Sequence, residues 1–188
     1  MILNPIVNDD SGRNDIFSIN LENRIVLLTG EIEDEMASSI ISQLLYLDSN
    51  GDEKICLYIN SPGGSVSAGL AIYDTIQSLK CPVSTICIGR AASMAAVILS
   101  GGARGERLAL RHSEIMIHQP SGGMTGQAED ILITAEHIRN IRNELNSILA
   151  ENCGRSVKEM EKATDRDNWM SSDDAVKFGI VDRVLDKR

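Results

Sequence analysis

Ser93 stands where an apolar, strand-like run gives way to small residues. The run Val83–Ile88 is short and rich in β-branched residues, which predicts a strand that is buried on both faces and ended by Gly89. The small residues from Ala91 onward predict a helix that begins near Ser93. The unpaired N–H groups of a helix start could hold an oxyanion, so Ser93 is a candidate nucleophile. Taken alone, the stretch fits a plain N-cap serine better.

A serine nucleophile needs a base that takes its proton and a carboxylate that orients that base. The chain has three histidines. His112 lies in a charged turn and His137 on the polar side of a long predicted helix, where a solvated side chain is the simple interpretation. His118 ends the apolar run Glu114–His118 beside a glycine-rich loop, which suits a working imidazole, although a structural histidine would fit there equally well.

The orienting acid is harder to select, because the chain contains 27 Asp and Glu residues. Asp165 and Asp167 have the most suitable context, a polar turn followed by Trp169 and Met170, and their spacing leaves both open. The chain has no G-x-S-x-G elbow, which argues against an α/β-hydrolase. It also has no H-E-x-x-H motif and no P-loop, which argues against a metalloprotease and a nucleotide hydrolase.

Composition and charge narrow the function classes further. A chain of 188 residues is expected to form one domain, and a net charge of −9 argues against a nucleic-acid partner. The cysteines form no C-x-x-C pair, which favours a reducing, cytoplasmic location. We expect no signal peptide, and no apolar run approaches the ~20 residues of a membrane helix. The four cysteines are Cys56, Cys81, Cys87 and Cys153.

The predicted elements begin with three successive strand-to-helix units, the pattern of a parallel sheet or superhelix with crossovers. Ligands collect at the carboxyl ends of such strands, where the turns Gly63–Gly64 and Gly89 both lie. The predicted strands are Arg24–Thr29, Ile55–Ile59, Val83–Ile88, Arg107–Leu110, Glu114–His118 and Ile180–Leu185. The predicted helices are Asp34–Asp48, Val66–Leu79, one beginning near Ser93, Ala128–Asn152, Val157–Ala163 and Ser172–Phe178.

Two segments lie outside the repeated strand-to-helix units: a long helix and the N-terminal segment. The helix predicted over about Ala128–Asn152 exceeds twenty residues and has apolar residues at nearly heptad spacing. Its stripe either packs against another copy of the chain or only covers the sheet. The segment Met1–Ser18 is polar and turn-rich, and we expect it to be flexible.

Four motifs, in this order and at this spacing, resemble the signatures of the ClpP family of caseinolytic protease subunits. They are Tyr58–Gln77, Ser84–Ala96, Ile115–Ile131 and Thr164–Val184. The resemblance extends from about Asp15 to the end of the chain. It implies an α/β fold of the ClpP/crotonase type, a superhelix of repeated β-β-α units. It also implies a flexible axial-pore segment at 1–18 and one protease domain at 19–188, with a protruding handle at about 119–152.

The resemblance implies a role for each matching residue. Ser93 would be the nucleophile, His118 the general base and Asp167 the orienting acid. The N–H groups of Gly64 and Met94 would form the oxyanion hole. An extended substrate would pair with two backbone segments by β-augmentation, which reads backbone rather than side chains. The residues of these segments are Gly64, Ser65, Val66, Ser121, Gly122 and Gly123.

The resemblance also implies an assembly. Two heptameric rings would stack face to face into a tetradecamer, with Asp165 and Arg166 at the contact between rings. Unfolded proteins would be delivered by an AAA+ unfoldase of the ClpX, ClpA or ClpC type. ATP would bind there, so this chain would need no cofactor and no metal. Mixed rings with a ClpP paralogue are also compatible with the family.

The sequence departs from the family pattern at several positions. Arg90 stands where glutamine is common, Trp169 where Phe is usual, and the pair Ala95–Ala96 lacks a glycine often found there. The segment Ser11–Ser18 is more divergent, which bears on unfoldase docking. Two alternatives to an active peptidase are a catalytically silent ring subunit and a crotonase-type acyl-CoA hydratase or isomerase. The intact serine, histidine and aspartate argue against the first, and the short chain against the second.

Overall fold

The structure is a computed structural model, which describes residues 5–9 and 12–185. Its strands are β1 (Ile6–Asp9), β2 (Gly12–Asp15), β3 (Ile25–Thr29), β4 (Ile55–Ser61), β5 (Val83–Ala92), β6 (Arg107–Leu110), β7 (Glu114–Ile117), β8 (Asn168–Ser171) and β9 (Arg183–Leu185). Its helices are α1 (Ile16–Glu22), α2 (Asp34–Ser49), α3 (Val66–Ser78), α4 (Met94–Ser100), α5 (Ala128–Cys153), α6 (Val157–Ala163) and α7 (Ser172–Phe178).

A seven-stranded, mostly parallel sheet forms the centre of the fold. Strands β3, β4, β5, β6 and β9 are parallel neighbours in that order, and helices α2, α3 and α4 follow β3, β4 and β5 in the chain. The long strand β5 pairs with β6 through its first half and with β7 through its last residues. The sheet therefore divides at β5, and the predicted α/β class with a parallel sheet is confirmed.

The prediction that Gly89 ends the third strand is wrong. Strand β5 continues to Ala92, and its register with β4 shifts between Ile59 and Ser61. At this irregularity the N–H of Arg90 donates to the side-chain oxygen of Asn60, at 3.2 Å. Beyond it, β5 takes β7 as an additional partner. The glycine thus marks a bulge at which the strand gains a new neighbour, which brings β7 to the end of β5.

Four elements in the structure were not predicted, namely β1, β2, α1 and β8. Strands β1 and β2 form an antiparallel pair, and α1 follows them with Asp15 as its N-cap, accepting from Phe17 N at 2.9 Å. The segment at 1–18, expected to be flexible, therefore contains helix and strand residues, while residues 1–4 and 10–11 lie outside the described residues. Strand β8 directly follows the polar turn that carries Asp165 and Asp167. The last strand is shorter than predicted, because residues 180–182 form a turn before it.

The core is aliphatic, as the scarcity of aromatic residues predicts. It includes fully buried leucine and isoleucine side chains from α2, β3, β4, α3 and α4. Cys87 lies within it at 0% exposure, and burial raises the pKa of its thiol to about 11, so it behaves as a small apolar side chain. None of the four cysteines forms a disulfide. In residues 5–9 and 12–185, no helix is long and apolar enough to cross a membrane.

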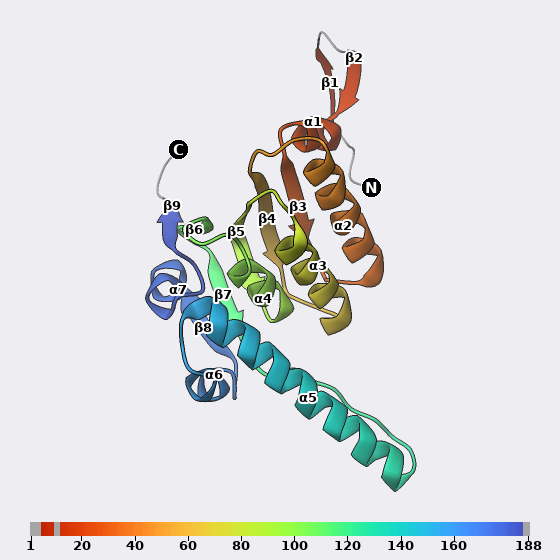
Figure 1. The fold of residues 1–188 in the computed structure, drawn as a ribbon, viewed down its shortest axis with the longest axis vertical. Helices are drawn as coiled ribbons and strands as arrows, with labels where there is room; N and C mark the ends of the chain where they lie inside the picture. The colour runs from red at the N-terminus through yellow and green to blue at the C-terminus, as the bar shows by residue number, and fades with distance from the viewer. Residues whose placement is uncertain (1–4, 10–11, 186–188) are drawn as a thin grey trace.

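Helix α5 projects away from the body of the molecule, and the chain that precedes it runs back along its side (Figure 1). Only its C-terminal part is packed, where Leu145 and Leu149 are buried. At its N-terminal part, Ile131, Leu132 and Ile133 are 42%, 62% and 68% exposed. The β1–β2 pair lies at the opposite end of the molecule from the tip of α5 (Figure 1). The exposed start of α5 is therefore not covered by its own chain, whereas the C-terminal part of its apolar stripe, from Ile141 to Leu149, packs against the core.

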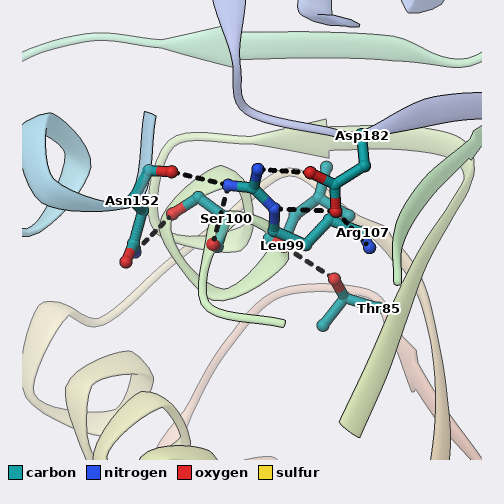
Figure 2. A network of polar contacts seen from close by, with 6 residues as sticks. All are labelled: Thr85, Leu99, Ser100, Arg107, Asn152 and Asp182. Atoms are coloured by element: carbon teal, nitrogen blue, oxygen red, sulfur yellow. Dashed lines mark hydrogen bonds and ion pairs between the residues drawn. The ribbon is translucent and has the colours of Figure 1, made fainter. Parts of the chain in front are cut away.

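A polar network joins the C-terminal ends of α4 and α5 to β6 and to the turn before β9 (Figure 2). Its centre is Arg107, whose side chain is 8% exposed. The guanidinium donates to both carboxylate oxygens of Asp182, at 2.5 and 3.1 Å, and to the carbonyl of Asn152, at 2.7 Å. The Asn152 amide donates to Ser100 Oγ at 3.0 Å. This network fixes the C-terminal end of the helix whose N-terminal end follows Ser93.

Candidate active site

Ser93 occupies the turn between β5 and α4. It is the N-cap residue of α4 by position, but its side chain makes no capping hydrogen bond. Its backbone has φ 56° and ψ −124°, in the left-handed half of the backbone map that non-glycine residues rarely enter. Such a conformation costs on the order of 1–3 kcal/mol and persists only where its surroundings impose it. Because Oγ caps none of the helix N–H groups, the plain N-cap interpretation does not hold.

His118 directly follows β7, which pairs in parallel with the end of β5. The register places Ala92 opposite Met116, and the N–H of Ser93 donates to the Met116 carbonyl at 2.8 Å. This pairing carries the imidazole to the serine, and His118 Nε2 lies 2.9 Å from Ser93 Oγ. By contrast, His112 and His137 are exposed.

Asp167 directly precedes β8, which pairs with β7 in the antiparallel direction. Because Asn168 stands opposite Ile117, the residues just outside this pair, Asp167 and His118, come together. Asp167 Oδ1 lies 2.9 Å from His118 Nδ1, with side-chain exposures of 62% and 27%. Of the two aspartates that the spacing left open, the geometry therefore brings Asp167 to the imidazole.

The turn Gly63–Gly64 lies directly against the Ser93 turn. A Cβ atom on Gly63, where φ is +94°, would stand 2.7 Å from Ser93 Cβ and 3.0 Å from Met94 N. Gly64 forms a parallel bridge with Ile32, in which Ile32 N donates to Gly63 O and Ser65 N donates to Ile32 O, each at 2.8 Å. In such a bridge the N–H of Gly64 points to the opposite side. Met94 begins α4, so its N–H has no partner within the helix.

A largely apolar cavity opens beside the serine and the histidine. Its walls come from α3, α4, β7, the segment after His118, and the packed end of α5. Ser93 and His118 stand at its edge, so a side chain seated in the cavity would belong to a residue whose carbonyl is close to Oγ. The remaining lining residues are Val66, Met94, Val97, Ile117, Pro120, Leu145, Asn146 and Leu149.

The residues expected to bind substrate backbone lie in two places. Ser65 is the N-cap of α3 and accepts from Ala68 N at 3.3 Å, and Val66 begins that helix next to Gly64. The segment Ser121–Gly123 is exposed and lies in the stretch that runs along α5, where a Cβ on Gly122 would meet Ile138 at 2.9 Å. Of the expected ring-contact residues, Asp165 and Arg166 are exposed and 4.0 Å apart.

Three residues near the site, Gln119, Thr164 and Asn146, were not predicted from the sequence. Gln119 bonds the turn that leads to Asp167 through both its backbone and its side chain. Thr164 is buried and donates to Asn146 Oδ1 at 2.8 Å. The only signal for Gln119 in the sequence was its position directly after His118, and nothing in the sequence indicated the other two.

A hydroxyl, an imidazole and a carboxylate joined in this order have the geometry of the serine hydrolase class. Within the described residues, no group of three or more His, Cys, Asp or Glu side chains could hold a metal ion. A family model described as Clp protease matches residues 8–188. The chain therefore belongs to the Clp protease family, a family of peptidases, and its α/β fold with a mostly parallel sheet agrees with that membership.

Proposed function

We propose that this chain is the proteolytic subunit of an ATP-dependent Clp protease, a serine endopeptidase that hydrolyses peptide bonds of unfolded proteins. The observation that carries the proposal is the continuous chain of hydrogen bonds from Ser93 Oγ through His118 to Asp167, both at 2.9 Å. Membership of the Clp protease family supports a peptidase rather than another serine hydrolase.

In the proposed reaction, Ser93 Oγ attacks the carbonyl carbon of the scissile bond while His118 Nε2 takes the hydroxyl proton. Asp167 holds Nδ1–H, which keeps Nε2 free as the acceptor and stabilises the imidazolium. The N–H groups of Gly64 and Met94 donate to the oxyanion of the tetrahedral intermediate. The imidazolium then protonates the leaving amine, and an acyl-enzyme remains. Water, deprotonated by His118, attacks the ester and regenerates the serine.

The substrate in this scheme is an extended peptide. One edge of the peptide would bond the backbone at Gly64–Val66, and the other edge would bond Ser121–Gly123. The side chain before the scissile bond would enter the apolar cavity, whose walls include Val97, Leu145 and Leu149. The enzyme would therefore accept many sequences and prefer an apolar side chain at this one position.

The proposed working unit is a tetradecamer of two stacked heptameric rings in which α5 interlocks the rings. The exposed apolar residues Ile131–Ile133 support this, since a helix with exposed apolar side chains gains stability by packing against another apolar surface. A closed chamber would admit only unfolded chains, so an AAA+ unfoldase of the ClpX, ClpA or ClpC type would supply them and hydrolyse the ATP. A ClpP paralogue in the same particle would also fit, and this chain itself would use no cofactor.

The test is hydrolysis of a short fluorogenic peptide by size-exclusion fractions of the purified protein, combined with labelling by a fluorophosphonate. We expect serine-dependent turnover and modification at Ser93 in a fraction near fourteen subunits. Ser93→Ala should lower turnover by at least ~10³-fold and leave the particle intact. Ser42→Ala, an exposed serine on α2, is the matched control. A well-formed particle without turnover or labelling would contradict the proposal and indicate a catalytically silent subunit.

A further inference from the structure

The side chain of Asp167 has few contacts that hold it in place. Its side chain is 62% exposed, and in the part of the chain that the structure describes, His118 is the only side chain that bonds its carboxylate. A hydrogen bond at an exposed position competes with water and contributes little to the position of its partners. The backbone that carries Asp167 must therefore be fixed by other contacts if the carboxylate is to stay at the imidazole.

Gln119 supplies such contacts from the position directly after His118. Its backbone N–H donates to the carbonyl of Thr164 at 2.6 Å, and its side-chain Nε2 donates to the carbonyl of Asp165 at 2.7 Å. Gln119 therefore bonds two consecutive carbonyl groups, and the second of them belongs to the residue two positions before Asp167. The residue that follows the base is thereby bonded to the turn that carries the acid.

The N-terminal side of this turn is firmly anchored. Thr164 is 1% exposed and caps the end of α6, and its Oγ1 lies 2.8 Å from Asn146 Oδ1 and 3.0 Å from Met160 O. On the other side, Asn168 enters β8 and donates to Ala163 O at 3.1 Å. Between these anchors, the exposed residues 165–167 are held to the β7 side by the side chains of His118 and Gln119 alone among the described hydrogen bonds.

We infer that Gln119 is a positioning residue of the catalytic site, whose side-chain amide holds the 165–167 turn so that Asp167 stays bonded to His118 Nδ1. The inference rests on the proposed function. The side chains of His118 and Gln119 and the turn form a closed ring of bonds. When the amide donor is removed, the His118–Asp167 bond must position the turn by itself, and water competes with it at Asp167.

Loss of the amide should change turnover more than substrate binding. A displacement of about 1 Å at a catalytic group can cost ~10²-fold in rate, and part of the population would keep its geometry. We therefore expect kcat to fall about 10- to 100-fold, with little change in KM.

The experiment measures kcat and KM of peptide hydrolysis for Gln119→Leu and Gln119→Glu. Leucine keeps the bulk of the side chain without a donor. At neutral pH the glutamate carboxylate keeps the shape but only accepts, so it cannot bond the Asp165 carbonyl. Gln43→Leu is the matched control, because Gln43 lies on α2 and its side-chain amide donates to Ser39 of the same helix, away from the proposed site and ring contact. Both Gln119 variants should lose turnover, and the control should not.

A double-variant cycle with Asp167→Ala distinguishes positioning from a general structural role. If Gln119 acts through Asp167, Gln119→Leu should have almost no effect once the carboxylate is gone. Full losses that multiply in the double variant would overturn the inference, as would normal turnover in either Gln119 variant or loss of the particle in both. An inactive wild-type enzyme would instead show that the proposed function has failed, so the two failures are distinguishable.

Discussion

Removal of the Asp182 carboxylate should destabilise the protein strongly without touching the catalytic residues. Asp182→Ala would leave the Arg107 guanidinium without its carboxylate partner. That side chain is only 8% exposed and would keep only carbonyl partners such as Asn152 O. Removal of one partner of a buried ion pair costs about 3–5 kcal/mol. Asp182 itself is 21% exposed, so water can replace part of the carboxylate, and we expect a loss near the lower end, about 3 kcal/mol. For a chain of this size, that corresponds to a Tm lower by about 6–12 °C.

The pH dependence of this loss has a definite sign. Burial alone would raise the pKa of the Asp182 carboxyl, but the hydrogen bonds and the charge of Arg107 outweigh burial and hold that pKa below its usual value. A carboxyl whose pKa is lowered in the folded state contributes stability above its unfolded pKa, about 3.9. This contribution is lost as pH falls through the folded pKa. The difference between wild type and Asp182→Ala should therefore be full at pH 7 and shrink below about pH 4.

The assay is urea unfolding of wild type and variant at one protein concentration, because assembly contributes to apparent stability. Trp169 is the single tryptophan and reports unfolding by its fluorescence. Replacing both partners, as in Arg107→Met with Asp182→Leu, should recover most of the loss, since no charge is then left unpaired. A loss under about 1 kcal/mol at pH 7, or a loss that does not change in acid, would refute this account of the network.

Two further perturbations test the proposed oxyanion hole and the proposed ring contact. Gly64→Ala places a Cβ atom 2.7 Å from Ile32 N and must displace the turn, so kcat of peptide hydrolysis should fall about 10²- to 10³-fold. The control Gly126→Ala, which has room for a methyl group, should leave kcat unchanged. Normal turnover in Gly64→Ala would contradict the proposed oxyanion hole. Arg166→Ala should loosen ring pairing and lower peptidase activity together, as measured by sedimentation and turnover on the same sample. A fully active single ring would refute that coupling.

The order of elements around Ser93 was predictable because each has a local signal. Apolar β-branched runs gave the centres of β3, β4 and β5, and apolar residues at helical spacing gave α2, α3 and α5. The bulge at Gly89 was not predictable in this way, because it is an irregularity in the pairing of β5 with β4, a contact between distant parts of the chain. The sequences of β1 and β2 show no alternation of apolar and polar residues, which is the pattern that identifies a strand.

Local sequence does not distinguish Asp165 from Asp167 as the orienting acid. Asp165 and Asp167 are both exposed and stand in the same turn, so neither burial nor composition separates them. The resemblance to a family selected Asp167, and the antiparallel register of β7 and β8 gives the physical reason for its position beside His118. Their roles in catalysis stay predictions. The bonds of Gln119 were invisible for the same reason, since they join segments more than forty residues apart.

The backbone of Ser93 has a consequence for selection in the laboratory. A residue with φ 56° and ψ −124° is strained for every side chain except glycine, so the position that is proposed to do the chemistry is also a weak point of the fold. Libraries screened for thermal stability alone would become enriched in glycine at position 93 and thereby lose the proposed nucleophile. Engineering of a more stable variant should therefore include a screen for turnover at every round, because at this residue stability and turnover are opposed.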